Sequence, residues 1–143
     1  MSRDSIRPGE VAVNIPNRID AGLLFIGYIR TPYAGPDDVP QDPKPATCLV
    51  EIDEPWHEAI IGLEGFRRIE LVYWNASARR DLVRQPRNDG HRSIGTFATR
   101  SLDRPNPIAS AIVEVIEVDT HWLRVRGLTC TNGTPLLDIR PID

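Results

Sequence analysis

The stretch IASAIVEVIEVDTHWLRVRGL, residues 108–128, decides the fold. Residues 108–119 form a long run rich in β-branched side chains, which favours a strand. Residues 122–128 alternate apolar and polar side chains, as a half-buried strand does. Residues 118–121 (VDTH) join the two segments and are typical of a hairpin turn. We therefore expect two antiparallel strands here.

Segments on both sides of this hairpin carry further strand patterns, while residues 76–89 are rich in arginine and predict an irregular loop or a helical turn. A short helix is expected over residues 57–63, because Asp53 and Pro55 form a helix start and Gly62 and Gly65 mark its end. Six or seven strands with one short helix predict a mainly β protein, a compact antiparallel β-barrel that is closed or partly closed. The other strands are expected over residues 23–30, 47–53, 67–74, 94–99 and 136–140.

The chain has 143 residues, a length that fits one domain with its own core. Residues 1–20 are polar and lack periodicity, so we expect a loose lead-in there and a single barrel domain over residues 21–143. No apolar run approaches the roughly 20 residues of a membrane-spanning helix, and no signal peptide is recognisable. These features predict a soluble cytoplasmic protein that does not enter a membrane.

Charge is distributed unevenly, although the formal net charge is only −3. Residues 37–64 hold eight acidic side chains against one lysine, whereas residues 79–104 hold seven arginines against three aspartates. Arginine binds carboxylate and phosphate groups in a bidentate manner better than lysine does. The arginine-rich stretch is therefore either a binding surface for an anionic partner or simply a solvated surface.

The common catalytic and cofactor motifs are missing. No GxGxxG, GxxxxGK[ST] or GxSxG motif occurs. The three histidines and two cysteines lack metal-ligand spacing, so we expect no metal site, and we expect Cys48 and Cys130 to be buried free thiols. No residue stands out as a catalytic acid, base or nucleophile.

One segment, GTFATRSLDRPNPI over residues 95–108, stands apart. Pro105 and Pro107 stiffen the backbone on both sides of Asn106, and the segment also presents Arg100, Ser101 and Arg104. A rigid loop with several hydrogen-bond donors can hold a small polar ligand. The alternative is a proline-stiffened turn whose arginines pair with neighbouring acids.

This segment resembles the GxFATRSxxRPNPIG signature of the TrmO family, also called YaeB or TsaA-like. Three further blocks are similar to the family pattern in the same order: IGYIRTPY (residues 26–33), GLEGF (62–66) and GTPLLDIRP (133–141). We call residues 95–108 the signature segment. The resemblance covers nearly the whole chain, in a short single-domain form.

The resemblance implies a compact antiparallel β-barrel that binds S-adenosylmethionine, forms a homodimer and methylates N6 of threonylcarbamoyladenosine in tRNA. The residues that match the family's cofactor-binding positions are Phe97, Ala98, Thr99, Arg100, Ser101, Arg104, Asn106, Thr134 and Asp138. Those that match its substrate-binding positions are Arg30, Tyr33, Arg84 and Arg87.

The chain also departs from the family pattern, mainly on the substrate side. Ala109 stands where a glycine is usual, Asn132 replaces an aspartate, Thr31 replaces a serine, and Arg67-Arg68 replaces Ser-His. Two other functions therefore remain open. The protein is then either a methyltransferase of a small molecule or a non-catalytic barrel that binds S-adenosylmethionine.

Overall fold

The computed structural model describes residues 4–17, 20–39, 46–87 and 93–142. The chain divides into two compact units. The barrel unit consists of Leu23–Trp74 and Ser110–Asp143, and the small unit consists of Met1–Gly22 and Asn75–Ala109. Each unit is described separately below.

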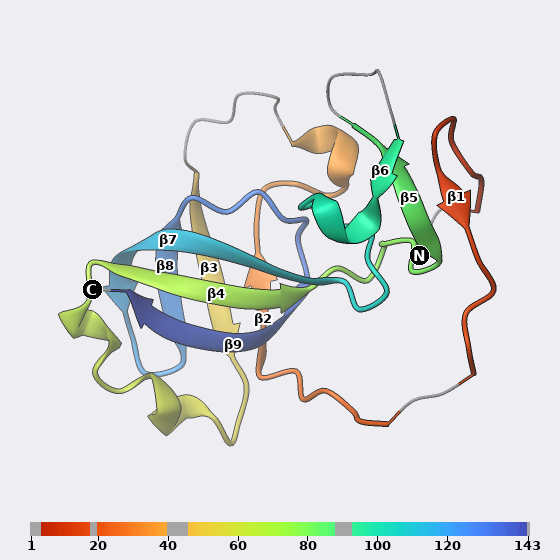
Figure 1. Ribbon diagram of the computed structural model, residues 1–143. Coiled ribbons are helices and arrows are strands. Elements are labelled where there is room, and N and C mark those ends of the chain that lie inside the picture. The colour runs from red at the N-terminus through yellow and green to blue at the C-terminus, as the bar shows by residue number, and fades with distance from the viewer. Residues whose placement is uncertain (1–3, 18–19, 40–45, 88–92, 143) are drawn as a thin grey trace. The chain divides into compact units, whose positions relative to one another are not determined.

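Six antiparallel strands form the closed barrel, which Figure 1 shows with its strands labelled. The order around the barrel is β2-β3-β8-β7-β4-β9, so the pairing of β2 with β9 closes the sheet. This confirms the predicted fold class. The strands are β2 (Gly27–Arg30), β3 (Thr47–Ile52), β4 (Arg68–Trp74), β7 (Ile108–Val118), β8 (Trp122–Arg126) and β9 (Thr134–Ile142).

Alternation along the strands builds the core of the barrel unit. In β4 every second side chain is buried, and β3 and β8 follow the same period. The predicted hairpin between β7 and β8 is present, with the Asp119 amide donating to the Trp122 carbonyl at 2.9 Å. Fully buried aliphatic side chains from five strands fill the interior: Ile29, Val50, Ile69, Leu71, Leu123, Val125 and Leu136.

Gly27 permits an unusually close approach between two barrel strands. It pairs with Ile52, and a Cβ atom at this position would lie 2.0 Å from the Glu51 carbonyl oxygen. Any side chain here would overlap backbone atoms of β3. The strand predicted from residue 23 starts only at Gly27, and Leu23 and Leu24 are exposed.

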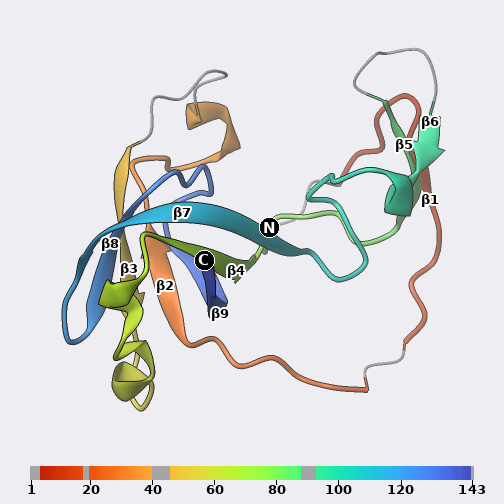
Figure 2. The same cartoon turned by 60° about the vertical axis from the view of Figure 1, so that its left-hand side comes forward.

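A second sheet of three strands belongs to the small unit, and Figure 2 shows it clearly. The central strand β5 (Leu82–Pro86) lies between β1 (Val11–Ala12) and β6 (Ser93–Gly95). The prediction of a loop or helical turn over residues 76–89 was therefore wrong for β5. The burial of β5 does not alternate, so its sequence lacks the usual strand signal. Strand β1 lies within the residues expected to form a lead-in.

The helical segments are single turns of 3₁₀ helix. The helix predicted over residues 57–63 is two such turns, η2 (His57–Ile60) and η3 (Leu63–Gly65), because Gly62 between them has a φ of 102°. The strand predicted over residues 94–99 ends at Gly95, where η4 (Thr96–Ala98) begins. A further 3₁₀ turn, η1 (Pro36–Asp38), follows β2. No helix in the described ranges is long and apolar enough to cross a membrane.

Candidate functional site

The signature segment folds back on itself through Arg104. Its Nη1 donates to the carbonyl oxygens of Thr99 at 2.6 Å and Ser101 at 3.2 Å. The Asp103 amide donates to Ser101 Oγ at 3.1 Å. Arg104, predicted to bind a cofactor, thus holds the backbone of residues 99–101 in one conformation. Arg104 as a whole is partly exposed.

A buried polar link attaches both ends of this loop to β5. The side chains of Gln85 and Thr96 are almost fully buried, at 5% and 3% exposed. Gln85 Nε2 donates to Thr96 Oγ1 at 3.1 Å and to the Asp103 carbonyl at 2.8 Å. Thr96 Oγ1 in turn donates to the Leu82 carbonyl at 2.8 Å. Buried polar groups are stable only when they are paired in this way.

Two preceding arginines brace the proline-rich end of the loop. The Arg79 amide donates to Asp103 Oδ1 at 2.9 Å, while its guanidinium forms an ion pair with Asp81. Arg80 Nε donates to the Pro105 carbonyl at 2.6 Å, and its Nη2 lies 3.4 Å from Asn106 Oδ1. Asn106 is exposed but is already part of this bracing.

Three of the predicted cofactor-binding residues, Thr99, Arg100 and Ser101, line one cavity of about 400 Å³ within the small unit. Arg7, Glu10 and Gln85 also line it. Arg7 and Arg100 are exposed, and among the described residues neither guanidinium has a hydrogen-bond or ion-pair partner. The cavity therefore combines two available cations with hydroxyl and carboxylate groups.

Phe97 and Ala98 occupy η4, next to this loop. Phe97 is 81% exposed, the largest exposure among the exposed large apolar side chains of the described residues. Arg84 is on β5, where its Nε donates to Ser93 Oγ at 2.8 Å and its Nη2 to the Ser93 carbonyl. Arg87 follows β5 and is exposed. Arg92, part of the same arginine-rich stretch, lies outside the described residues.

In the barrel unit, Arg30, Tyr33 and Thr134 come together at the turn before β9. The Asn132 amide donates to the Tyr33 carbonyl at 2.7 Å, and Thr134 Oγ1 donates to the Thr131 carbonyl at 2.7 Å. Tyr33 and Thr134 are buried, whereas Arg30 is exposed and paired with Glu51 at 3.1 Å. These contacts fix the turn and leave the Arg30 side chain at the surface.

Asp138 lies further along β9 and is not part of that cluster. Its carboxylate accepts hydrogen bonds from its neighbour's amide, Ile139, at 2.9 Å and from Arg140 Nε at 3.1 Å. The side chain is about half exposed. Arg140 therefore competes with any hydrogen-bond-donating ligand for the Asp138 carboxylate.

Two departures from the family pattern contact each other. The Thr31 amide donates to Asn132 Oδ1 at 3.1 Å, and Thr31 Oγ1 donates to the Cys130 carbonyl at 2.8 Å. An amide oxygen accepts a hydrogen bond as a carboxylate does, and threonine has the hydroxyl of serine. The residue pair thus keeps the hydrogen-bonding groups that the family pattern supplies at these positions.

The two thiols are free, as predicted, but only Cys48 is buried, while Cys130 is partly exposed. Burial raises the pKa of the Cys48 thiol, and burial together with the neighbouring Cys48 raises the pKa of Cys130 to about 11. Burial likewise raises the pKa of Tyr73 to about 12, with a smaller effect from Cys130. Because a thiolate is the reactive form of cysteine, neither thiol is a good nucleophile at neutral pH.

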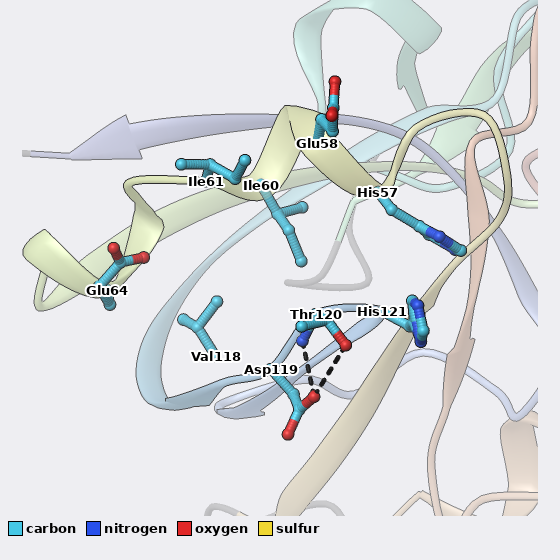
Figure 3. Close-up of a pocket in the computed structure, with 9 residues that line it drawn as sticks. All are labelled: His57, Glu58, Ile60, Ile61, Glu64, Val118, Asp119, Thr120 and His121. Atoms are coloured by element: carbon cyan, nitrogen blue, oxygen red, sulfur yellow. Dashed lines mark hydrogen bonds between the residues drawn. The ribbon is translucent and has the colours of Figure 1, made fainter.

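A second cavity, of about 560 Å³, lies in the barrel unit and contains none of the predicted site residues. Ile60 and Val118 line its apolar part, and the rings of His57 and His121 lie together at one end with centroids 4.2 Å apart (Figure 3). His57 Nε2 lies 2.8 Å from the Ile52 carbonyl, which holds the ring in place. No three metal-ligating side chains gather here or elsewhere in the described ranges.

Sequence reasoning missed five residues that line the small-unit cavity: Arg7, Glu10, Gln85, Pro86 and Asp103. Gln85 is hidden in a strand without alternation, so no pattern indicates its burial. The Pro8-Gly9 dipeptide is a turn signal and could have shown that residues 7–10 are ordered. The small unit, in chemical terms, offers a site for a small ligand with a carboxylate or phosphate group.

Comparison with known proteins supports one family throughout. The family model described as "tRNA-methyltransferase O N-terminal domain" matches residues 28–142. A probable S-adenosyl-L-methionine-binding protein, VirR, of Rhizobium radiobacter is 43% identical over 99% of this chain and 82% of its own length. A tRNA (adenine(37)-N6)-methyltransferase of Escherichia coli is 36% identical over 81% of this chain.

Solved structures agree in fold. A crystal structure of TrmO superposes with a TM-score of 0.75 at 30% identity over 87% of this chain, and one of TrmO from Pseudomonas aeruginosa gives 0.71. The chain spans only 55% of the Escherichia coli methyltransferase and 58% and 56% of these two structures. With a family model that matches most of its length, the chain belongs to the family of the tRNA-methyltransferase O N-terminal domain.

Proposed function

We propose that this protein binds S-adenosylmethionine and transfers its methyl group to N6 of an adenosine in tRNA. The observation that carries the proposal is the cavity on the signature segment, in which Thr99, Arg100 and Ser101 meet. Membership of a family with methyltransferase relatives supports the same activity.

The groups in this cavity fit the cofactor. S-adenosylmethionine carries a carboxylate, an ammonium group, a ribose diol and a sulfonium cation. Arg100 can donate to the carboxylate in a charge-assisted hydrogen bond, and the hydroxyls of Thr99 and Ser101 can donate or accept. Thr134 and Asp138 in the barrel unit are further candidate cofactor-binding residues. The Asp138 carboxylate would suit the cationic groups or the ribose diol of S-adenosylmethionine.

The cofactor supplies an activated methyl group when it is bound. The protein's task is then mainly to hold donor and acceptor in line and to exclude water. The rigid loop suits this task because Arg104, Gln85 and Thr96 fix its backbone before a ligand arrives. An activated nucleophile in the protein is not required, in agreement with the raised pKa values of both thiols.

Transfer of tritiated methyl groups tests the function. The protein is incubated with labelled S-adenosylmethionine and either total cellular RNA or a small-molecule extract, and the RNA is digested to nucleosides. We expect label in N6-methylated threonylcarbamoyladenosine, with a loss of at least tenfold in Arg100→Gln and none in the surface variant Arg126→Gln. Label in the extract alone would indicate a small-molecule methyltransferase. Cofactor binding without any transfer would indicate a binding protein.

A tRNA substrate also predicts a salt dependence. Arg84 and Arg87 are exposed and would contact phosphates, so RNA affinity should fall steeply as salt is raised. For single-stranded RNA the slope of log affinity against log salt is about −0.7 per phosphate contact. Replacing both arginines with glutamine should flatten the slope by about one unit or more and leave cofactor binding unchanged. A flat profile for the wild type would contradict tRNA as the substrate.

The proposal extends to assembly and location. We infer a homodimer, as the family resemblance implies, and a cytoplasmic location, where tRNA is found. Light scattering at micromolar concentration should give twice the 16.0 kDa mass of one chain. A monomer would contradict the dimer and leave the methyl-transfer test unaffected.

A further inference from the structure

The turn formed by residues 7–10 is held firmly against β5. The Arg7 amide donates to Glu10 Oε1 at 2.8 Å, and the Glu10 amide donates to the Arg7 carbonyl at 3.1 Å. Gly9 has a φ of 85°, and a Cβ atom there would lie 3.2 Å from Pro86 Cβ. The turn therefore lies directly against the end of β5, in a conformation that favours glycine.

Backbone pairing continues this attachment along β5. Val11 and Ala12 of β1 pair with Arg84 and Leu82, and the Val13 amide donates to the Asp81 carbonyl at 2.8 Å. The same strand holds the signature loop through Gln85. One strand thus positions two segments, the turn with Arg7 and the loop with Arg100, which line the same cavity.

The charges that line this cavity are balanced. Arg7 and Arg100 supply two positive charges, and Glu10 and Asp103 supply two negative ones. A phosphate group would be attracted by the arginines and repelled by both carboxylates. A zwitterion with a carboxylate and an ammonium group a few ångströms apart would find opposite charges for both of its ends.

We propose that Arg7 and Glu10 complete the binding site, and that the cavity binds an α-amino-acid zwitterion, the methionine end of S-adenosylmethionine. Arg7 and Arg100 bind the carboxylate, and Glu10 lies on the ammonium side. The proposal rests on the proposed function for the identity of the ligand. Residues 7–10 lie outside the stretch that the family model matches, so that match does not cover this part of the cavity.

Calorimetry with two ligands tests this assignment. S-adenosylmethionine contains the amino-acid end, and 5′-methylthioadenosine lacks it. Arg7→Gln should weaken binding of S-adenosylmethionine about tenfold, the effect of one charge-assisted hydrogen bond, while 5′-methylthioadenosine binds with unchanged affinity. Arg126→Gln, which removes a surface arginine from the barrel unit, is the matched control and should bind both ligands normally.

The variant Glu10→Gln separates the zwitterion from a phosphate. Its amide oxygen can still accept from the Arg7 amide, so the turn is kept while the negative charge is removed. Affinity for S-adenosylmethionine should fall by about threefold or more. If the cavity binds a phosphate instead, Glu10→Gln should raise the affinity for RNA, and Arg7→Gln should lower it.

The outcomes distinguish this inference from the proposed function. If the wild type does not bind S-adenosylmethionine, both fail. If the wild type binds it and Arg7→Gln binds it equally well, only the inference fails. Equal weakening for both ligands would show that Arg7 supports the fold of the small unit and does not contact the amino-acid end, which also overturns the inference.

Discussion

The barrel unit and the small unit are stabilised by different interactions. In the barrel unit, alternating aliphatic side chains such as Ile69 and Leu71 are fully buried, and strand pairing closes the sheet. In the small unit the key buried contacts are polar, between Gln85, Thr96 and the loop backbone. An apolar core tolerates many similar side chains, whereas a hydrogen-bonded link requires particular groups at fixed positions. The small unit, whose buried contacts require particular polar groups, is also the unit that carries the candidate site.

The largest effect is expected from Gly27→Ala in the barrel unit. The new Cβ would lie 2.0 Å from a backbone oxygen of β3, so the two strands must separate there. We expect a loss of about 3 kcal/mol or more in the free energy of unfolding, measured by urea denaturation. Gly65→Ala is the control, since nothing lies within 4 Å of its added methyl group and its φ is not positive. Equal stability of the two variants would refute the close approach of β2 and β3.

The barrel unit should also respond to alkaline pH through Cys130. Burial raises the pKa of this thiol from 9.0 to about 11, so the folded state binds its proton more tightly than the unfolded state does. The stabilisation is complete below pH 9 and is lost as the pH rises to 11, by about 2 kcal/mol. Melting temperatures measured over this range should fall more steeply in the wild type than in Cys130→Ala. Parallel curves for the two proteins would contradict the raised pKa.

In the small unit the test is Gln85→Leu, which keeps the size of the side chain and removes its donor. The Asp103 carbonyl and Thr96 hydroxyl then lose a partner, at a cost of about 1–2 kcal/mol. Hydrogen exchange of the amides in residues 96–104 should accelerate, while that of β4 and β9 stays the same. Val83→Ala, at an exposed position of the same strand, is the control. Unchanged exchange in the loop would show that Gln85 does not hold it.

The smallest effect is expected at a surface ion pair of the barrel. Arg126 Nη1 lies 3.8 Å from Glu114 Oε1, and both side chains are more than 40% exposed. Solvent screening makes such a pair worth less than about 0.5 kcal/mol. Arg126→Gln should therefore unfold at nearly the same urea concentration as the wild type. If Arg126→Gln lowered the urea midpoint as much as Gln85→Leu does, the expectation that buried polar contacts contribute more stability than exposed ones would be contradicted.

The same contrast explains how much of the structure could be predicted from the sequence. Strands β3, β4, β7, β8 and β9 carry alternating or β-branched patterns, so their positions follow from the residues. Strand β5 has only Leu82 and Gln85 buried, and no periodicity reveals it. The signature segment could be singled out because its prolines and arginines are unusual. The cavity beside it could not, because Arg7 reaches it only through the pairing of β1 with β5 and the packing of Gly9 on Pro86.

Closure of the barrel between β2 and β9 sets the order in which the protein can be completed during synthesis. Gly27 pairs with Leu136, more than 100 residues later in the chain, so β2 leaves the ribosome long before its partner exists. Until then one edge of β2 has unpaired backbone groups, which can pair with other chains. Contacts of such long range also slow folding. Early release of this chain, before residue 134, would therefore leave an open sheet prone to aggregation, and chaperone dependence should be greatest at this stage.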